Sequence, residues 1–563
     1  MKTLPLCAAL ALAAPALSAA GPSAVDAALK QRFDGDRTGA CAVAAIIDGD
    51  RVERGMFCAD ASRRVGPDVA FEIGSVSKTI TGALLAGLIA EGRVTLATPL
   101  AEVLPSGTTV PSFEGQPITL RHLLSHTAGL PALPPGFAPA NMADPYADLT
   151  EAQLLDGLGK VQLAAAPGSA WEYSNFGAML LSVAVSRIGG QPFPELARQR
   201  VFAPLGMDAT HVGSAPAGTV DAPGHRSSGD VVPGWTFAAA LAGVGGVRSP
   251  LDDMVRYVQA QLGQGDAATV AMLQAAQAPM GNAGQPMAMG WAIAPFNDRD
   301  IFAHEGGTFG FSSFVAFDRK AGRGVVVLAD TALSDLGGLA DIGLPLLDPS
   351  VPVGAPRRLQ SPPQALLERM AGDFLIGDSL PATLRQRDGA LYLQAAGQPE
   401  SKLAYDSEGD FFPEAFDALL TPDADGQGFT WMQGGGAMPA VRVDAAASAR
   451  SAADADADAD VDVDVDVDVD AGPQAASADA APLADFTGSY PLMPGFALRV
   501  FEEGGQLRAQ ATGQGAFALD AGGPDRFTAA AVGIVLRFVR DEAGRVERLE
   551  LDQGGQTLGG ARE

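Results

Sequence analysis

An acidic low-complexity segment constrains the fold of this chain most strongly, because it cannot belong to a packed core. Aspartate occupies every second position from Asp454 to Asp470, and residues 444–483 consist mainly of Ala, Asp and Val. The alternation has strand period, but it would align like charges on one face, and Asp is a poor strand former. We therefore predict an extended acidic linker at residues 444–483. A calcium loop is the alternative, although the Asp-rich stretch lacks the Gly and closing Glu of such loops.

Length and composition indicate several globular domains. A chain of 563 residues is too long for one ordinary core, and an apolar content of 47% excludes global disorder. The nine aspartates of the alternation contribute to the net charge of −28, so −19 remains for the rest of the chain. This acidity disfavours nucleic acid as a partner.

The sequences on the two sides of the linker repeat each other. Residues 389–398, Gly-Ala-Leu-Tyr-Leu-Gln-Ala-Ala-Gly-Gln, match residues 505–514, Gly-Gln-Leu-Arg-Ala-Gln-Ala-Thr-Gly-Gln. Short alternating segments punctuated by Gly and Asp predict antiparallel strands that close into small barrels. We therefore predict two duplicated β-barrel domains, at residues 363–443 and 484–563.

The remaining part, residues 21–350, predicts a larger α+β domain. Apolar residues at helical spacing indicate one helix from residue 80 to about residue 91, and two more at residues 178–188 and 251–262. Strand patterns lie at residues 40–47, 51–57, 311–317 and 325–329.

The first twenty residues predict a cleaved signal peptide. Lys2 supplies a positive charge, residues 4–17 are apolar, and residues 18–20 are small residues before a cleavage site. A buried N-terminal helix is the alternative, which Pro5 and Pro15 disfavour. No later apolar run reaches the length of a membrane span. We expect a periplasmic or secreted protein without a transmembrane segment.

Two cysteines remain after the signal peptide. If Gly49-Asp50 forms a two-residue turn, Asp48 pairs with Arg51 and Cys41 falls opposite Cys58. This register makes the cysteines a non-hydrogen-bonded pair, where Cα atoms approach most closely. In an oxidising compartment it predicts a cross-strand disulfide between them, and not a catalytic or metal site.

Ser75 and Lys78 lie three residues apart at the start of an apolar helical run. A serine hydroxyl is a weak nucleophile and needs a neighbouring base. A lysine amine is such a base when burial depresses its pKa. The spacing alone is common, so a solvated Ser–Lys pair at a helix start is the alternative.

Two later segments favour the catalytic interpretation. Tyr173 and Asn175 follow the turn-rich residues 166–168, which would present them on a loop, with a phenol for proton transfer and an amide to hold the lysine and the substrate. Residues 304–313 contain three glycines before an apolar strand, which lets a substrate backbone lie close to it.

In order and spacing, these segments resemble the penicillin-binding-protein and class C β-lactamase family of serine hydrolases. Residues 118–131, Ile-Thr-Leu-Arg-His-Leu-Leu-Ser-His-Thr-Ala-Gly-Leu-Pro, are typical of the same family. The resemblance implies an antiparallel sheet flanked by helices, with a helical subdomain. It also implies that Ser75 is acylated, that Lys78 and Tyr173 share the proton transfers, and that Asn175 positions the substrate.

The resemblance further implies an oxyanion hole built from the backbone N–H groups of Ser75 and Gly307, each worth roughly 3 kcal/mol.

The sequence departs from the family at one motif. Where β-lactamases carry Lys-Thr-Gly, this chain has His304-Glu305-Gly306. The lysine binds a substrate carboxylate, whereas a histidine is largely neutral at pH 7. We expect His304 and Gly306 to bind substrate, although a strand-edge histidine bonded to the backbone is the alternative.

This departure favours an esterase or D-amino-acid peptidase acting on a small acyl substrate. A β-lactamase or D,D-carboxypeptidase, and a non-catalytic binding protein on the same fold, are the alternatives. We expect no cofactor and no metal, because His122 and His126 lack the glutamate of a His-Glu-x-x-His site. The three tryptophans at positions 171, 235 and 291 are expected to fill the core, and lining a pocket is the alternative. The barrels resemble lipocalin-like barrels appended to this family, and would cover the active site or contact the cell wall.

Overall fold

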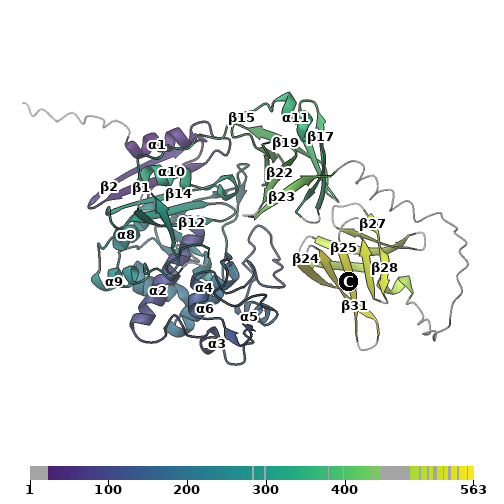
Figure 1. Cartoon of the computed structure of the whole chain (residues 1–563), viewed down its shortest axis with the longest axis horizontal. Helices are drawn as coiled ribbons and strands as arrows, with labels where there is room; N and C mark the ends of the chain where they lie inside the picture. Colours follow the sequence, from purple (N-terminus) through teal and green to yellow (C-terminus); the bar gives the residue numbers. More distant parts are fainter. Residues whose placement is uncertain are drawn as a thin grey trace, which may run out of the picture.

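The computed structural model describes residues 23–562 except for residues 444–481 and several short gaps (Figure 1). The gaps are residues 282–283, 297–298, 378–379, 397, 425, 434–435, 494–495, 504–505, 512–515, 524, 530–533, 542–543 and 554–555. The predicted signal peptide, residues 1–20, lies outside the described residues. So does the predicted linker, except for its last two residues.

A six-stranded antiparallel sheet forms the centre of the first domain, in the order β11-β12-β13-β14-β1-β2. Its strands are β1 (Cys41–Asp48), β2 (Arg51–Cys58), β11 (Ala292–Phe296), β12 (Arg299–Gly307), β13 (Ser312–Asp318) and β14 (Arg323–Ala329). Alternate residues of β14 face opposite sides of the sheet. Val325 and Val327 pack with α1 (Ala24–Phe33) and α10 (Ala340–Leu347), whereas Val326 and Leu328 belong to the core on the other face. In Figure 1, α1 and α10 lie on the upper face of the sheet, and helices α2 (Ser77–Ala90), α4 (Leu120–Leu124), α6 (Asn175–Gly189), α8 (Leu251–Gln261) and α9 (Ala267–Ala275) of the same domain lie below it.

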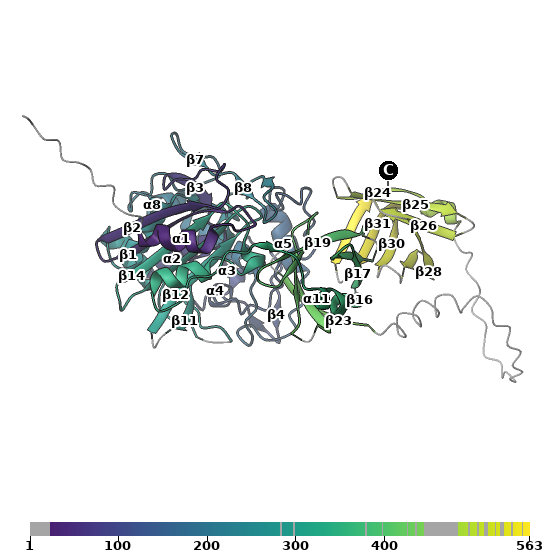
Figure 2. The same cartoon turned by 90° about the horizontal axis from the view of Figure 1, so that it is seen from above.

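One buried helix, α2, lies in the middle of the helical layer, and in the view from above its label falls among those of β1, β12 and β14 (Figure 2). Helix α2 (Ser77–Ala90) is apolar on all sides and buried from Ser77 to Leu88, because α6 and α9 pack against it. The other helices are α3 (Leu100–Val103), α4 (Leu120–Leu124), α5 (Glu151–Gly159), α6 (Asn175–Gly189), α7 (Phe193–Ala197), α8 (Leu251–Gln261) and α9 (Ala267–Ala275). Short strands complete the layer: β3 (Val69–Glu72), β4 (Ser112–Phe113), β5 (Gln116–Pro117), β6 (His211–Val212), β7 (Val220–Asp221), β8 (Gly224–His225), β9 (Val231–Val232) and β10 (Val247–Ser249). Both ends of each of the three predicted helices lie within three residues of the corresponding ends of α2, α6 and α8.

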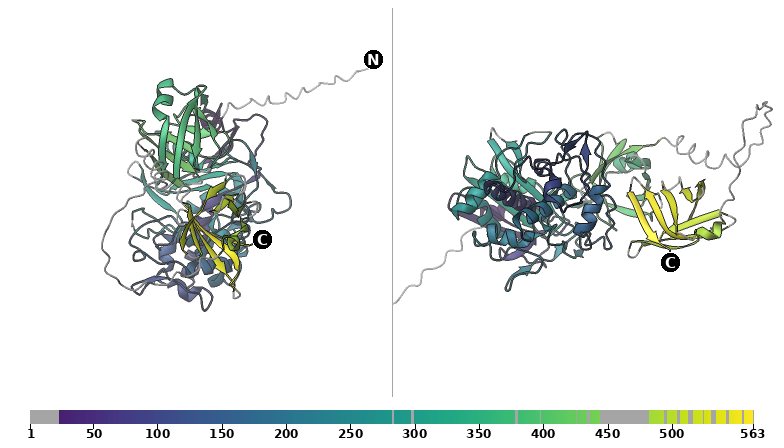
Figure 3. Two further views of the ribbon diagram at one scale, coloured as in Figure 1. Left: turned by 90° about the vertical axis from the view of Figure 1, so that its right-hand side faces the viewer. Right: turned by 90° about the horizontal axis from the view of Figure 1, so that it is seen from below.

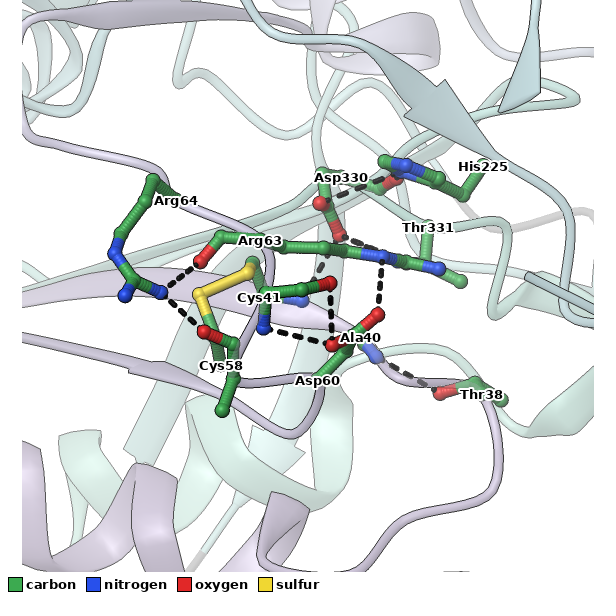
Figure 4. The surroundings of a disulfide bond; sticks show 12 residues. Thr38, Ala40, Cys41, Cys58, Asp60, Arg63, Arg64, His225, Asp330 and Thr331 are labelled. Atoms are coloured by element: carbon green, nitrogen blue, oxygen red, sulfur yellow. Dashed lines mark hydrogen bonds and ion pairs between the residues drawn. A yellow bond between two sulfur atoms is a disulfide. The ribbon is translucent and has the colours of Figure 1, made fainter. Parts of the chain in front are cut away.

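The β1–β2 hairpin has the register expected from its turn. Asp48 pairs with Arg51, and Cys41 pairs with Cys58, to which it is bonded by a disulfide. Figure 4 shows that the disulfide adjoins a polar cluster at the end of the sheet. There Asp330 accepts a hydrogen bond of 2.9 Å from the backbone N–H of Cys41. The disulfide therefore ties the edge strand β2 to the buried strand β1.

The first C-terminal domain is an eight-stranded barrel that closes because β20 pairs with both β21 and β19. Phe374, Phe411, Phe429 and Trp431 lie inside it. The barrel strands are β16 (Gly372–Ile376), β17 (Leu380–Arg387), β18 (Ala390–Ala395), β19 (Ser401–Asp406), β20 (Phe411–Pro413), β21 (Leu419–Pro422), β22 (Gly428–Gln433) and β23 (Gly436–Arg442), preceded by β15 (Leu359–Gln360) and α11 (Gln364–Met370).

Buried ion pairs join this barrel to the first domain. The carboxylate of Asp406, which is fully buried, lies 3.1 Å from Arg37 and 3.1 Å from Arg357. Arg357 also contacts Asp410 at 2.6 Å, and Leu419 joins the hydrophobic core beside α1. The outer surface of the barrel is thus packed against the first domain.

The second C-terminal domain consists of two antiparallel sheets around one core (Figure 3). Its elements are the 3₁₀ turn η6 (Leu483–Phe486), β24 (Gly488–Met493), β25 (Phe496–Glu503), β26 (Gln506–Ala511), β27 (Ala516–Ala518), β28 (Asp520–Gly523), β29 (Arg526–Ala529), β30 (Ile534–Arg540), β31 (Val546–Gln553) and β32 (Gln556–Ala561). The repeated sequence segments form β18 in one barrel and β26 in the other. Each is preceded by a hairpin partner and a first strand, so the duplication in sequence corresponds to equivalent strands.

None of the helices in the described ranges is long and apolar enough to cross a membrane.

Removing the disulfide is expected to destabilise the first domain. The two cysteines are 17 residues apart, and closing such a loop stabilises a fold by about 3 kcal/mol. We expect the Cys41→Ala/Cys58→Ala variant to unfold at lower urea concentration, as measured by circular dichroism. Reductant should lower the midpoint of the unmodified protein and leave that of the variant unchanged. Equal midpoints for the oxidised and reduced protein would contradict this expectation.

Candidate active site

Ser75 lies in a tight turn between β3 and α2. Residues Gly74–Val76 form a 3₁₀ turn, and the α-helix begins only at Ser77. Ser75 therefore lies at the start of the apolar helical run, in a 3₁₀ turn that leads directly into α2. The contact with Lys78 survives because side chains at i and i+3 eclipse in a 3₁₀ turn. The Ser75 side chain is half-buried and its hydroxyl faces Lys78.

The amine of Lys78 is buried among three oxygen atoms. Its Nζ lies 2.8 Å from Ser75 Oγ, 2.9 Å from Asn175 Oδ1 and 2.8 Å from the carbonyl oxygen of Val244. The amide and carbonyl oxygens only accept hydrogen bonds, so they occupy the two hydrogens of a neutral amine. The amine lone pair is then left for the Ser75 hydroxyl hydrogen. Burial lowers the pKa of Lys78 to about 7, which makes the neutral amine accessible near neutral pH.

The phenol of Tyr173 contacts the same serine oxygen. Its hydroxyl donates a hydrogen bond of 2.8 Å to Ser75 Oγ. Burial raises the pKa of Tyr173 to about 12, so the phenol keeps its hydrogen at neutral pH. Ser75 Oγ therefore lies between a hydrogen donor, Tyr173, and a hydrogen acceptor, Lys78. This arrangement suits a hydroxyl that loses its proton to the amine as it attacks.

Asn175 reaches Lys78 from the start of another helix. It is the first residue of α6, whose N-cap Ser174 accepts a hydrogen bond of 2.9 Å from the backbone N–H of Gly177. The expected loop therefore holds Tyr173 but not Asn175. Its place on a capped helix fixes the Asn175 amide against the Lys78 amine.

Glycines allow strand β12 to pack directly against the turn that carries Ser75. A Cβ added to Gly74, which has φ +49°, would lie 2.8 Å from the backbone N of Gly307. A Cβ added to Gly306 would collide with the carbonyl oxygen of Ile73. From the sequence we expected the glycines of residues 304–313 to leave space for a substrate. For Gly306 the reason is different, because a side chain there would point at the Ile73 backbone and not at a substrate.

His304 is a neutral group beside the amine. Its Nδ1 lies 2.7 Å from the backbone carbonyl oxygen of Glu305, as the alternative interpretation of this histidine expects. Burial, and secondly the charge of Lys78, lower the pKa of His304 to about 4. At neutral pH the imidazole therefore supplies no positive charge for a substrate carboxylate.

The Val244 carbonyl, Tyr146 and Phe309 carry no signal in the sequence that places them in this region, whereas Trp235 was among the tryptophans expected in the core. The carbonyl of Val244 carries no side-chain signal, and only the surrounding glycines mark the segment. Trp235 packs edge-on against Tyr146 and Phe309 at ring-centroid distances of 5.1 Å. These three rings form an aromatic wall that ends at Phe309, two residues after β12.

The other histidines and tryptophans have separate roles. His122 Nδ1 accepts a hydrogen bond of 3.1 Å from the backbone N–H of Thr119 and so caps α4, as a structural role predicts. Trp291 is fully buried, as expected for a core residue. The same expectation is wrong for Trp171, which is 37% exposed and lies beside the ring of Tyr173.

A family profile and the sequences of known relatives identify one family. The sequence profile of the family described as Beta-lactamase matches residues 25–342. The D-alanyl-D-alanine-carboxypeptidase/endopeptidase AmpH of Escherichia coli (strain K12) is 31% identical over 317 residues, which cover 53% of this chain and 81% of AmpH. A protein named Beta-lactamase from the same strain is 30% identical over 329 residues, covering 51% of this chain and 83% of that protein. The solved structure of a β-lactamase/D-alanine carboxypeptidase from Yersinia pestis complexed with citrate is 27% identical, with a TM-score of 0.46, over 55% of this chain and 92% of that one.

The pH dependence of acylation is expected to follow the protonation of Lys78. The amine accepts the serine proton only when it is neutral, and its pKa is about 7. The acylation rate should rise about tenfold per pH unit below that value and level off above it. Single-turnover kinetics with an activated ester between pH 5 and pH 9 measure this. A rate that stays constant through pH 7, or that rises only near pH 10, would exclude this amine as the base.

Substituting Gly74 is expected to remove acylation without unfolding the domain. In Gly74→Ala the new methyl would displace the Gly307 backbone, whose N–H is the predicted oxyanion donor. Losing such a donor costs about 100-fold or more in rate. Gly92→Ala is the matched control, because Gly92 also has a left-handed φ of +71° but has no atom within 4 Å of the added carbon. Equal acylation rates in the two variants would contradict the prediction.

Proposed function

Because the chain belongs to the Beta-lactamase family of serine hydrolases, we propose that it forms an acyl-enzyme at Ser75 and hydrolyses small esters or amides, of the esterase or D-amino-acid peptidase type. The observation that carries the proposal is the Lys78 amine. Two neutral acceptors occupy its hydrogens, and its lone pair is left for the serine 2.8 Å away. A lysine in this environment acts as a base rather than as a fixed cation.

In the proposed acylation, Ser75 Oγ forms a bond to the substrate carbonyl carbon while its proton passes to Lys78 Nζ. The carbonyl oxygen becomes an oxyanion held by the backbone N–H groups of Ser75 and Gly307. As the tetrahedral intermediate collapses, Tyr173 gives its hydroxyl proton to the departing alcohol or amine. Lys78 then gives the proton that it took from Ser75 to the Tyr173 phenolate, which restores both groups to their starting protonation states.

In the proposed deacylation, water replaces the departed group at the same place. As the water attacks the ester carbonyl of the acyl-enzyme, one proton passes to Lys78 Nζ, with the Tyr173 hydroxyl accepting the hydrogen of the water and giving up its own. When the tetrahedral intermediate collapses, Lys78 returns this proton to Ser75 Oγ and the acid is released. Both half-reactions use the same donor and acceptor on opposite sides of Ser75 Oγ.

The charge at the site supports substrates without an essential carboxylate. His304 stands where β-lactamases carry a lysine, and burial keeps this imidazole neutral at neutral pH. Phe309, two residues after Gly307, begins the aromatic wall of Trp235, Tyr146 and Phe309, so apolar rings adjoin the predicted oxyanion donor along the chain. Esters and amides with neutral or apolar acyl groups fit these surroundings better than anionic β-lactams.

A β-lactamase or D,D-carboxypeptidase is the second candidate. The activities named for AmpH and for the Escherichia coli Beta-lactamase favour it, because the chain is 31% and 30% identical to these proteins over most of their length. For this function a cation other than His304 would have to bind the substrate carboxylate.

We also propose that the enzyme acts outside the cytoplasm. The pattern of residues 1–20 and the Cys41–Cys58 disulfide support export, since disulfides persist in oxidising compartments. The two barrels would then meet cell-wall material or limit access to the site.

A substrate panel with an active-site variant tests the proposal. We expect phenyl esters and D-alanyl amides to be turned over faster than nitrocefin, and mass spectrometry to find the trapped acyl group on Ser75. Ser75→Ala should lose at least about 1,000-fold in rate with little loss of stability. Ser169→Ala, an exposed serine in the loop before Tyr173, is the matched control. Turnover of nitrocefin alone would favour the second candidate, and an adduct on another residue would contradict both.

A further inference from the structure

His126 adopts a backbone conformation that few side chains tolerate. It follows α4 and has φ +53°, which lies in the left-handed region. Its side chain is 5% exposed, and its imidazole is directed toward the segment that carries Tyr173. Asn, Asp and His are the non-glycine residues most often found in this conformation, because their short polar side chains bond locally. The strain indicates that the position of this side chain matters.

Two hydrogen bonds from His126 hold the residues on both sides of Tyr173. The backbone carbonyl of His126 accepts one of 2.8 Å from the N–H of Glu172. Its Nδ1 accepts another of 3.2 Å from the N–H of Ser174. The left-handed φ turns the His126 carbonyl and the His126 ring toward the same segment, residues 172–174, so one residue supplies both acceptors.

The ring of His126 also contacts the ring of Tyr173 directly. The two centroids are 4.5 Å apart, and the planes are tilted by 31°. Within the described chain, the main chain of residues 170–173 has one hydrogen bond, the bond from Glu172 to His126. The next anchor is the Ser174 hydroxyl, which donates to the carbonyl of Pro131 at 2.6 Å. His126 thus contacts this segment at the Glu172 N–H, at the Tyr173 ring and at the Ser174 N–H.

We propose that His126 is a positioning residue, which holds the loop of Tyr173 so that the phenol hydroxyl stays at Ser75 Oγ and delivers its proton to the leaving group. This inference rests on the proposed acyl-enzyme function. His126 touches neither Ser75 nor the substrate carbonyl in this scheme and acts through Tyr173 alone.

The protonation state of His126 agrees with this role. Nδ1 must be unprotonated to accept from the Ser174 N–H, so the ring hydrogen sits on Nε2. Burial, followed by the charges of Lys78 and His304, lowers the pKa of His126 to about 3. The acceptor is therefore present throughout the pH range in which Lys78 is titrated.

Three substitutions separate the acceptor, the ring and the backbone conformation. His126→Asn tolerates a left-handed φ and places an oxygen close to the position of Nδ1, so it keeps the acceptor but loses the ring. His126→Phe keeps an aromatic ring and loses the Nδ1 acceptor. His126→Gly keeps the backbone conformation and loses both the ring and the Nδ1 acceptor. His122→Asn is the matched control, since it alters a histidine of the same segment that caps α4.

The readout is the dependence of the acylation rate on the leaving group, measured with p-nitrophenyl and alkyl esters of one acid. A misplaced Tyr173 fails to protonate the alkoxide, whereas p-nitrophenolate leaves without a proton. We expect His126→Phe and His126→Gly to lose about 100-fold on the alkyl ester and much less on the p-nitrophenyl ester, as a displacement of about 1 Å does. His126→Asn should stay within about tenfold of the unmodified enzyme, and KM should change little in all three.

A double-mutant cycle decides whether His126 acts through Tyr173. If it does, His126→Phe/Tyr173→Phe should be no slower than Tyr173→Phe alone. Additive losses, or equal losses on both esters, would overturn the proposal. If His126→Phe does not fold, as judged by thermal denaturation, His126→Gly takes its place in the same cycle. Failure of the unmodified enzyme to form an adduct at Ser75 would instead refute the proposed function, so the two failures are distinguishable.

Discussion

A buried amine with only neutral oxygen partners is the interaction on which the rest of the site depends. Lys78 Nζ is held by the Asn175 amide and the Val244 carbonyl, and burial lowers its pKa to about 7. A carboxylate in either place would stabilise the ammonium and remove the base. The two acceptors come from α6 and from the 3₁₀ turn η3 (Ala242–Val244), while the amine comes from α2. The packing of these three segments therefore creates the base.

The second constraint is the close approach of strand β12 to the turn of Ser75. Gly74 and Gly306 leave no side chain between the two segments, so backbone contacts backbone there. The proposed nucleophile Ser75 and the predicted oxyanion donor at Gly307 are thereby held by the central sheet rather than by a free loop. Rigid support of this kind is what stabilisation of a developing charge requires, because donors that must reorganise lose their advantage.

Two neutral imidazoles lie within the electrostatic influence of the Lys78 amine. His126 and His304 both have pKa values far below their usual range, because burial and the charge of Lys78 disfavour protonation. The titration of the site near neutral pH is therefore left to Lys78. The sequence resemblance places the neutral His304 where β-lactamases carry a lysine. The substrate class proposed above follows from this difference in charge.

Local patterns in the sequence determined much of this protein. The helix at 251–262, the register of the Cys41–Cys58 hairpin, the duplicated barrels and the Ser75–Lys78 spacing follow from periodicity, turn chemistry and internal repetition, which act over a few residues. Only the tertiary structure decided that Val244 completes the amine site. It also decided that Gly306 packs against Ile73, and that His126 holds the loop of Tyr173. Lys78 is 97 residues from Asn175 and 166 from Val244, and contacts over such distances leave no local periodicity to read. A backbone carbonyl, moreover, belongs to every residue, so its use as an acceptor is set by packing and not by residue type.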